Sequence, residues 1–341
     1  MAQKINREEM LRAFQSVSPG LTTKEILQQS SCLVFRRDRV HTFNDEIACS
    51  VPSPISDFEG AVPAKPFIAV LSKLPDELLQ VTTNAEKVEV AGKGRKLKVN
   101  REAEILLPID DLEQPDEWSQ LPANFFEAVS LVGTCASKDE SEFQLTCVHI
   151  GESVIEATDR YQIGRYEIEC GFEKDICVRA DSLDKASGFG MVQYCITDNW
   201  IHFRNEADLV FSCRTWVDDY EDLAQYLEFE RDTPVVLPNG LDEVLARAEI
   251  FSADNVRSKN VGVSLQSGAV IFKGEGAYGE YMERRPISYD GDSLQFTIAP
   301  KLLLAVTEKA SECYVDGSKL SVDAGAFLYL ASLEAVEEEE N

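Results

Sequence analysis

The sequence is poor in the residues that most often hold metal ions or act as general bases. Its 341 residues include only three histidines, His41, His149 and His202, and none has a second candidate ligand at the spacing that metal sites use. The nine cysteines form no CxxC pair, and their odd number disfavours a disulfide framework. We therefore expect no metal, no cofactor, and thiols that are buried and unreactive.

Long apolar runs and basic charge are also scarce. No stretch approaches the ~18 apolar residues that cross a bilayer. The first ten residues, MAQKINREEM, contain no apolar segment typical of a secretion signal, so we expect a cytoplasmic protein with no membrane partner. Lysine and arginine number 33 against 60 aspartates and glutamates, a net charge of −27. This balance repels polyanions and argues against a large nucleic-acid surface.

Two glycine-rich stretches resemble phosphate-binding loops only superficially. Residues 274–279, GEGAYG, match GxGxxG, but the following EYMERRPISY alternates like a strand, whereas a dinucleotide site needs a helix there. The pattern favours a connection between strands. Residues 91–96, AGKGRK, lack the GK[ST] of a phosphate loop and predict a hairpin tip, with contact to DNA phosphate as an alternative.

One carboxylate cluster could support catalysis. Asp218 and Asp219 lie close to Glu221 and Asp222, and paired carboxylates can bind Mg²⁺ or transfer protons. A charged surface loop is the simpler interpretation, and no serine occupies a nucleophile elbow. We predict that the protein is not an enzyme, and we keep a hydrolase or nuclease that uses this cluster as an alternative.

The chain contains an internal repeat. Amphipathic helices are predicted to begin near residues 7, 123 and 239, which are 116 residues apart both times. A second helix-like stretch follows each of them, and alternating runs with hairpin turns lie between. The six helical segments are 7–18, 63–74, 123–138, 179–190, 239–251 and 299–310.

This order predicts an α+β protein made of three tandem copies of one unit, with antiparallel sheets covered on one face by two helices each. Segments 113–122 and 228–238 both end in Leu-Pro and are predicted to be linkers. The predicted domains are 1–118, 119–232 and 233–334, followed by an acidic tail over 335–341.

Three phrases, in this order and repeat, resemble the bacterial sliding clamp, the beta subunit of DNA polymerase III, over nearly the whole chain. They are VPAKPFIAVLSKLPDE at 62–77, EATDRYQIG at 156–164 and ISYDGDSLQFTIAPKLLLAV at 287–306. The resemblance implies a homodimeric ring with helices inside and sheets outside. It implies a processivity factor that encircles double-stranded DNA without reading its sequence, tethers the replicative DNA polymerase and is opened by a clamp loader ATPase.

A DNA-encircling ring should keep its basic residues on the helices. The six segments carry ten lysines and arginines against nine acids, a net +1, so the remaining residues carry −28. The lining would then tolerate phosphate without gripping it. Helices are often near neutral, so this count supports the resemblance without proving it. The basic residues predicted to face DNA are Arg7, Arg12, Lys24, Lys65, Lys73, Lys138, Arg179, Lys185, Arg247, Lys301 and Lys309.

The resemblance also implies an apolar groove in which short peptides of partner proteins dock. The residues that correspond to it are Thr158, Arg160, Tyr161, Gln162, Ile163, Leu328, Leu330, Ser332 and Leu333. The sequence departs from the family here, because Arg160 stands where the family has glycine and Gln162 where it has arginine. The bound motif should therefore differ. The alternative is a plain strand corner in which Thr158 and Asp159 cap a turn.

Subunit contacts follow from the same resemblance. Clamp rings close head to tail, which gives a ring rather than a fibre. Ile250 and Phe251 match an apolar pair at the family's interface, and Ile105 and Leu107 are predicted on the opposing surface. Ordinary core packing is the alternative for these residues. The divergent motifs and strong acidity suggest a divergent clamp, bacterial or phage-encoded. The rival for the whole chain is an acidic scaffold or DNA mimic that uses this fold without encircling DNA.

Overall fold

The structure is a computed structural model that describes residues 2–25, 27–113, 115, 117–216, 220–229, 233–252, 260–298, 300, 303–304, 312–316 and 319–332. It is a mixed α/β chain built from antiparallel sheets and short helices. The chain forms two compact units, Met1–Ala123 with Ser182–Trp216, and Asn124–Asp181 with Val217–Asn341. The three-domain division stays a prediction.

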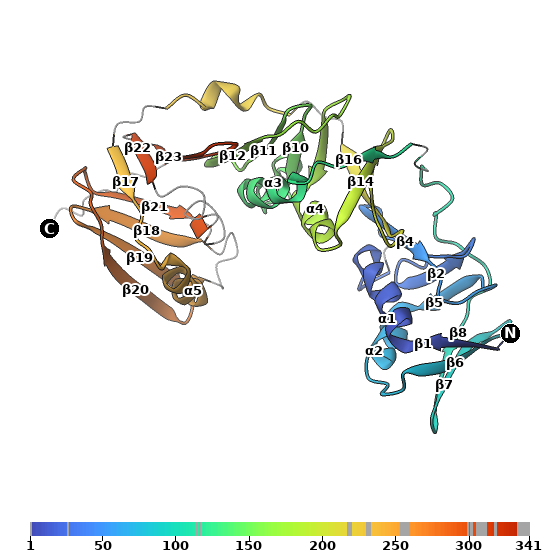
Figure 1. The fold of residues 1–341 in the computed structure, drawn as a ribbon. Coiled ribbons are helices and arrows are strands. Elements are labelled where there is room, and N and C mark those ends of the chain that lie inside the picture. The colour runs from blue at the N-terminus through green and yellow to red at the C-terminus, as the bar shows by residue number, and fades with distance from the viewer. Residues whose placement is uncertain are drawn as a thin grey trace. The chain divides into compact units, whose positions relative to one another are not determined.

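The first unit contains two antiparallel arrays (Figure 1). A four-stranded sheet has the order β1-β6-β7-β8, and a second array has the order β9-β14-β15-β16-β4-β3-β2-β5. The strand bounds are β1 Ala2–Asn6, β2 Cys32–Arg36, β3 Arg39–Phe43, β4 Ile47–Pro52, β5 Gly60–Pro63, β6 Leu78–Thr83, β7 Lys87–Gly92, β8 Arg95–Asn100, β9 Ser119–Gln120, β14 Met191–Ile196, β15 Trp200–Asn205 and β16 Val210–Trp216.

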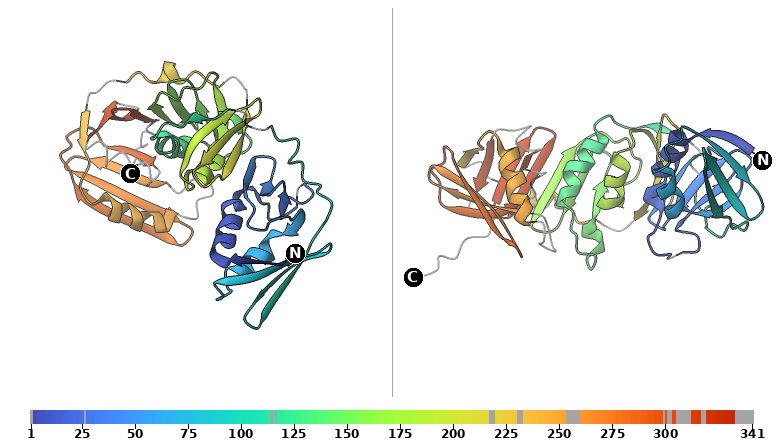
Figure 2. Two further views of the ribbon diagram at one scale, coloured as in Figure 1. Left: turned by 45° about the vertical axis from the view of Figure 1, so that its right-hand side comes forward. Right: turned by 90° about the horizontal axis from the view of Figure 1, so that it is seen from below.

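Two helices of the first unit, α1 (Arg7–Ser16) and α2 (Ala64–Leu71), lie side by side (Figure 2). The Asn6 side chain begins α1 by accepting hydrogen bonds from two backbone N–H groups of its first turn. Phe14 of α1 packs on Phe67 of α2 with ring centroids 5.2 Å apart, and both rings are fully buried. Burial of this apolar face fixes which helix surface remains for solvent.

The second unit also contains two antiparallel arrays, with the orders β17-β22-β23-β24-β12-β11-β10-β13 and β20-β19-β18-β21 (Figure 1). Direct hairpins join most neighbours. The strand bounds are β10 Cys147–Ile150, β11 Val154–Thr158, β12 Gln162–Glu167, β13 Ile176–Arg179, β17 Thr233–Val236, β18 Val261–Gln266, β19 Ala269–Gly276, β20 Gly279–Pro286, β21 Leu294–Ile298, β22 Glu312–Asp316, β23 Lys319–Ala324 and β24 Phe327–Ser332.

Helices α3 (Phe125–Val132) and α5 (Leu241–Ser252) pack closely on strands of the second unit. A Cβ added at Gly274 of β19 would lie 1.9 Å from the carbonyl oxygen of Ala248 in α5. The glycine-rich stretch at 274–279 therefore includes a position where the helix backbone touches the strand. It joins β19 to β20, as predicted, and forms no phosphate loop.

Five of the six predicted helical segments are confirmed as α1, α2, α3, α4 (Ala180–Ser187) and α5. The sixth, 299–310, lies almost wholly outside the described residues. Residues 91–96 form the tip between β7 and β8, as predicted. Eight of the nine cysteines are buried, and Cys195 is partly exposed. None of the helices in the described part of the chain is long and apolar enough to cross a membrane.

Candidate partner-binding groove

The corner between β11 and β12 is held by its own side chains. Thr158 donates from Oγ1 to the Gln162 carbonyl at 2.8 Å and accepts from the Arg160 N–H at 3.0 Å. Asp159 accepts from the N–H groups of Tyr161 and Gln162, both at 3.0 Å. Arg160 takes a left-handed backbone with φ of 76°. The capping predicted for Thr158 and Asp159 is therefore present.

Strand β24 lies directly beside this corner. Ile163 of β12 is opposite Leu330 of β24, and the Ser332 N–H donates to the Tyr161 carbonyl at 2.8 Å. Tyr329 donates from its hydroxyl to Oε1 of Gln162 at 3.0 Å. The structure thus brings together residues that are more than 160 positions apart and that the resemblance assigned to one groove.

A segment missed by the sequence analysis completes the apolar cluster. Residues 220–229, the groove segment, place Leu223 in a buried cluster with Ile163 and Leu330. Tyr220, Leu227, Phe229 and Leu328 pack around this cluster and are partly buried. Apolar residues at 220, 223 and 227 were the available signal, but acidic neighbours made the segment look like a charged loop and linker.

The remaining predicted groove residues differ in how much surface they offer. Tyr161 is 71% exposed, and Ser332 is also exposed. Arg160 is exposed and pairs with Glu142 at 2.7 Å. Thr158 is only 3% exposed, so it shapes the corner from within. Leu333 lies outside the described residues.

A polar row crosses the same sheet face next to the apolar cluster. His149 of β10 is opposite Glu156 of β11, which is opposite Arg165 of β12, and facing residues project to the same side of a sheet. Glu156 is 5% exposed and accepts from Arg165 Nη1 at 2.6 Å. The His149 ring stacks on Tyr220 of the groove segment, with centroids 4.9 Å apart and planes 10° from parallel.

Several predicted DNA-facing cations are exposed. Arg12 of α1, Lys65 of α2, Lys73 just beyond α2, Lys185 of α4 and Lys24 have exposed side chains. Among the described residues, none of these five forms an ion pair. Charges of this kind remain available to a phosphate backbone.

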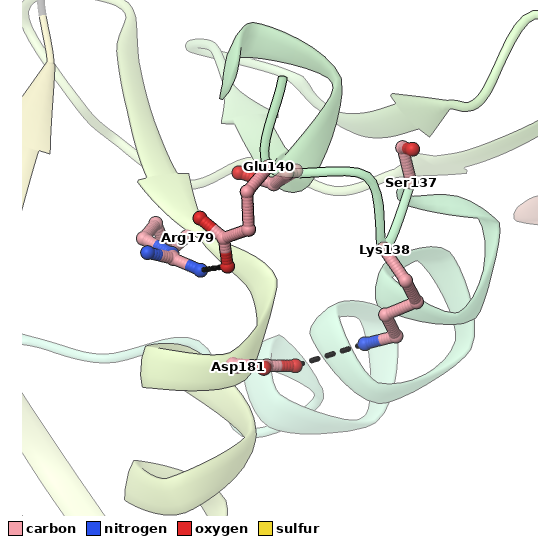
Figure 3. A pocket seen from close by; sticks show the side chains of 6 residues that line it. Ser137, Lys138, Glu140, Arg179 and Asp181 are labelled. Carbon is pink, nitrogen blue, oxygen red and sulfur yellow. Dashed lines mark hydrogen bonds and ion pairs between the residues drawn. The ribbon is translucent and has the colours of Figure 1, made fainter. Parts of the chain in front are cut away.

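Other predicted DNA-facing residues are paired with acids of the chain. Lys138 contacts Asp181 at 2.8 Å, and Arg179 donates to Glu140 (Figure 3). Ser137 and Thr146 complete the small polar pocket that these four residues line. Arg247 contacts Glu283 at 2.8 Å, and Arg7 contacts Glu8 at 3.1 Å. Lys301 and Lys309 lie outside the described residues.

Known proteins resemble this chain in structure but not in sequence. No protein-family model matches the sequence, and no curated protein matches it either. Solved structures do match. The DNA polymerase beta subunit of Streptococcus pyogenes superposes with a TM-score of 0.76 at 18% identity, over 98% of this chain and 100% of that chain. The sliding clamp of Bacillus subtilis superposes with a TM-score of 0.74 at 15% identity, over 99% and 100%.

The DNA polymerase III beta subunit of Thermotoga maritima gives a TM-score of 0.74 at 14% identity, over 98% of this chain and 100% of that chain. This chain has the sliding-clamp fold. The resemblance to bacterial beta subunits drawn from the sequence is confirmed at the level of fold. The identity is low, so the fold survives here with a largely different set of side chains.

The residues predicted at a clamp interface differ in exposure. Ile250 at the end of α5 is 72% exposed, and Phe251 stacks on Tyr281 with centroids 6.3 Å apart. Leu107 is 3% exposed and belongs to a core cluster of the first unit, against which Ile105 packs. Leu107 therefore has no surface to offer a second chain, whereas Ile250 does.

Four carboxylates were considered for catalysis, and two of them, Asp218 and Asp219, lie outside the described residues. Glu221 accepts from the Tyr226 hydroxyl at 2.8 Å, and Asp222 caps the Ala224 N–H at 2.9 Å. Within the described residues, histidine, cysteine, aspartate and glutamate form no cluster of three that could hold a metal ion. Glu221 and Asp222 thus have local structural partners.

Proposed function

We propose that this chain is a DNA sliding clamp, a cytoplasmic processivity factor that tethers a replicative DNA polymerase to duplex DNA. The observation that carries the proposal is the apolar rim of Tyr220, Leu227, Phe229 and Leu328, which are partly buried around the Ile163–Leu223–Leu330 cluster in a chain with the sliding-clamp fold. An extended peptide can place apolar anchors on such a surface while backbone hydrogen bonds fix its register. The protein holds DNA by topology and needs no catalytic residue.

The proposed DNA contact is electrostatic and independent of sequence. Arg12, Lys65 and Lys73 present exposed charges on or beside α1 and α2, and phosphate contacts of this kind carry no sequence information. Contacts of this kind suit sliding, because they hold every position on the duplex equally well. The acidic remainder of the chain would repel DNA from other surfaces.

The proposed assembly is a two-chain ring closed head to tail, with Ile250 at the contact. A heterologous contact that closes on itself gives a ring. Opening such a ring around DNA would fall to a separate clamp loader ATPase. The rival function, an acidic scaffold or DNA mimic with the same fold, requires no ring.

Light scattering and negative-stain electron microscopy of the full chain test the assembly. A mass of twice the 38.0 kDa chain and particles with a central hole wide enough for a duplex would support the clamp. Single chains or solid particles at micromolar concentration would contradict it and favour the scaffold.

The groove is tested by selecting peptides from a random display library against the full chain. We expect selected peptides to carry apolar anchors and to lose at least tenfold in affinity in Leu328→Asp, since a charge there meets an apolar surface. Leu78→Asp, an equally drastic change at an exposed leucine of β6, is the matched control. Equal effects of the two variants would remove the groove from the proposal.

A further inference from the structure

The groove segment rests on a charged residue as well as on apolar ones. Its first described residue, Tyr220, stacks on His149, and its later residues Leu223 and Leu227 contact the Ile163–Leu330 surface. The segment therefore spans the polar row and the apolar cluster of one sheet face. A contact that holds Tyr220 in place therefore also fixes the position of Leu223 and Leu227 in the groove.

His149 is placed between two carboxylates. Its Nδ1 lies 3.1 Å from Oε1 of Glu156 on β11, and its Nε2 lies 3.3 Å from Oδ2 of Asp175, just before β13. A carboxylate only accepts hydrogen bonds, and a neutral imidazole has a single N–H. Both contacts can be hydrogen bonds only when the ring carries its second proton.

Charged and titratable groups face the ring from the neighbouring strands. On the neighbouring strand β13, Cys177 is paired opposite His149. From β12, Arg165 donates a hydrogen bond to Glu156. Burial lowers the pKa of His149, but the hydrogen bonds and negative charges of Glu156 and Asp175 outweigh it and raise the pKa above 6.5. The two carboxylates thus favour the protonated ring.

The hydroxyl of Tyr220 is buried. Burial and then the charge of Glu156 raise the pKa of Tyr220 well above its ordinary value. The phenol therefore stays neutral. Its contribution to holding the segment comes from contact between the faces of the two stacked rings.

We propose that His149 is a positioning residue of the groove: protonated and held by Glu156 and Asp175, its ring supports Tyr220 and so fixes the groove segment against the sheet. The inference rests on the proposed peptide-binding function and deepens it. It makes the affinity for a partner peptide dependent on a proton. As pH rises and the ring gives up that proton, one of its two carboxylate hydrogen bonds breaks and the segment loosens.

Hydrogen exchange on the free full chain tests the proposal without any partner. Amide exchange of peptides covering 220–229 is measured between about pH 6 and 8, the range of histidine titration, and is corrected for the intrinsic rate. We expect the segment to exchange faster as pH rises. His149→Phe keeps the stack but cannot titrate, so its exchange should be independent of pH. His149→Ala should exchange roughly five- to tenfold faster than wild type at pH 6.

Two further variants keep the test decisive if His149→Ala disturbs the sheet. Tyr220→Leu removes the stack from the segment side and should speed exchange of 220–229 while β10 to β12 stay protected. Asp175→Asn removes one charge at an exposed carboxylate and should move the midpoint of the pH profile to lower pH. A wild-type profile with no pH dependence, or one that persists in His149→Phe, would overturn the proposal, as would unchanged protection in Tyr220→Leu.

The peptide obtained by selection supplies the second readout. Wild type should bind it more tightly at pH 6 than at pH 8, and His149→Phe should bind it equally at both. If no peptide is selected, the groove function fails, while the exchange profile still decides whether His149 positions the segment. If peptides bind with no pH dependence although the exchange profile titrates, the link between the segment and binding is overturned.

Discussion

At the scale of single residues, close contacts decide what each position tolerates. Gly274 has a helix carbonyl where a side chain would be, and His202 is fully buried between Ser212 and Thr197. In the sequence, Gly274 belongs to a GxGxxG match, and His202 is an isolated histidine. Neither pattern revealed the neighbours of these residues, because those neighbours are fixed only when the chain folds.

Gly274→Ala should destabilise the second unit by about 3 kcal/mol, since the added methyl meets the backbone of Ala248 and the helix must move. The measurement is the urea midpoint of the transition reported by the second unit. Gly262→Ala is the control, because its Cβ would meet the nearest atom at an ordinary 3.5 Å. Equal midpoints for the two variants would contradict the packing argument.

Acid should weaken the first unit through its buried histidines. Burial lowers the pKa of His202 to about 4, from an ordinary value of 6.5. Because the folded state binds this proton less readily than the unfolded chain, stability is complete above about pH 6.5 and falls as pH drops toward 4. His202 alone should account for about 3 kcal/mol of this loss.

Unfolding of wild type and His202→Gln at several pH values measures this effect. The variant should show a shallower decline between pH 6.5 and 4, even if it is less stable throughout. His41, whose pKa burial also lowers to about 4, continues to titrate in it and gives the residual slope. Parallel declines in the two proteins would exclude His202 as the source.

At the scale of elements, apolar periodicity was sufficient to predict most of the helices. Leu11, Phe14 and Val17 recur every three residues, and Phe14 and Val17 are fully buried. A clear hairpin turn separates β18 from β19 at Ser267–Gly268. The groove segment was not predicted from the sequence, because its apolar residues are interspersed with acidic ones. The ion pairs of Lys138 and Arg179 were also beyond the sequence, since their partners are 43 and 39 positions away.

The exposed cations of the α1–α2 pair should set the salt dependence of DNA binding. Replacing Arg12, Lys65 and Lys73 with alanine should make the slope of log K against log salt shallower by about 0.9 for each phosphate that is no longer neutralised. Fluorescence anisotropy with a short labelled duplex at low ionic strength provides the slope. Lys4→Ala, at an exposed lysine of β1 in the same unit, should leave it unchanged. A flatter slope in Lys4→Ala alone would place DNA on the sheet.

At the scale of the whole molecule, the fold is shared with clamps at 14–18% identity, so its determinants are patterns rather than particular residues. Repeated helix and strand order was readable from the sequence because a fixed spacing of 116 residues separates similar segments. The pairing of β12 with β24 was not readable from periodicity. It was anticipated only through the family resemblance, because the residues of a strand do not specify which distant strand it pairs with.

Assembly should depend on the exposed end of α5. Ile250→Asp should halve the mass measured by light scattering, to the 38.0 kDa of one chain, because a charge at a buried contact is costly. Tyr278→Asp, at another exposed apolar residue of the second unit, should leave the mass unchanged. A variant at Ile250 that still forms the larger species would move the interface elsewhere.

The cysteines of the chain have a practical consequence for single-molecule work. Eight of the nine thiols are buried, and burial raises the pKa of Cys49 and Cys313 to about 12. Cys195 is the partly accessible one. A maleimide dye should therefore couple to the native chain chiefly at Cys195, with no engineered cysteine needed. Diffusion of one labelled molecule along stretched DNA could then be followed in a fluorescence microscope.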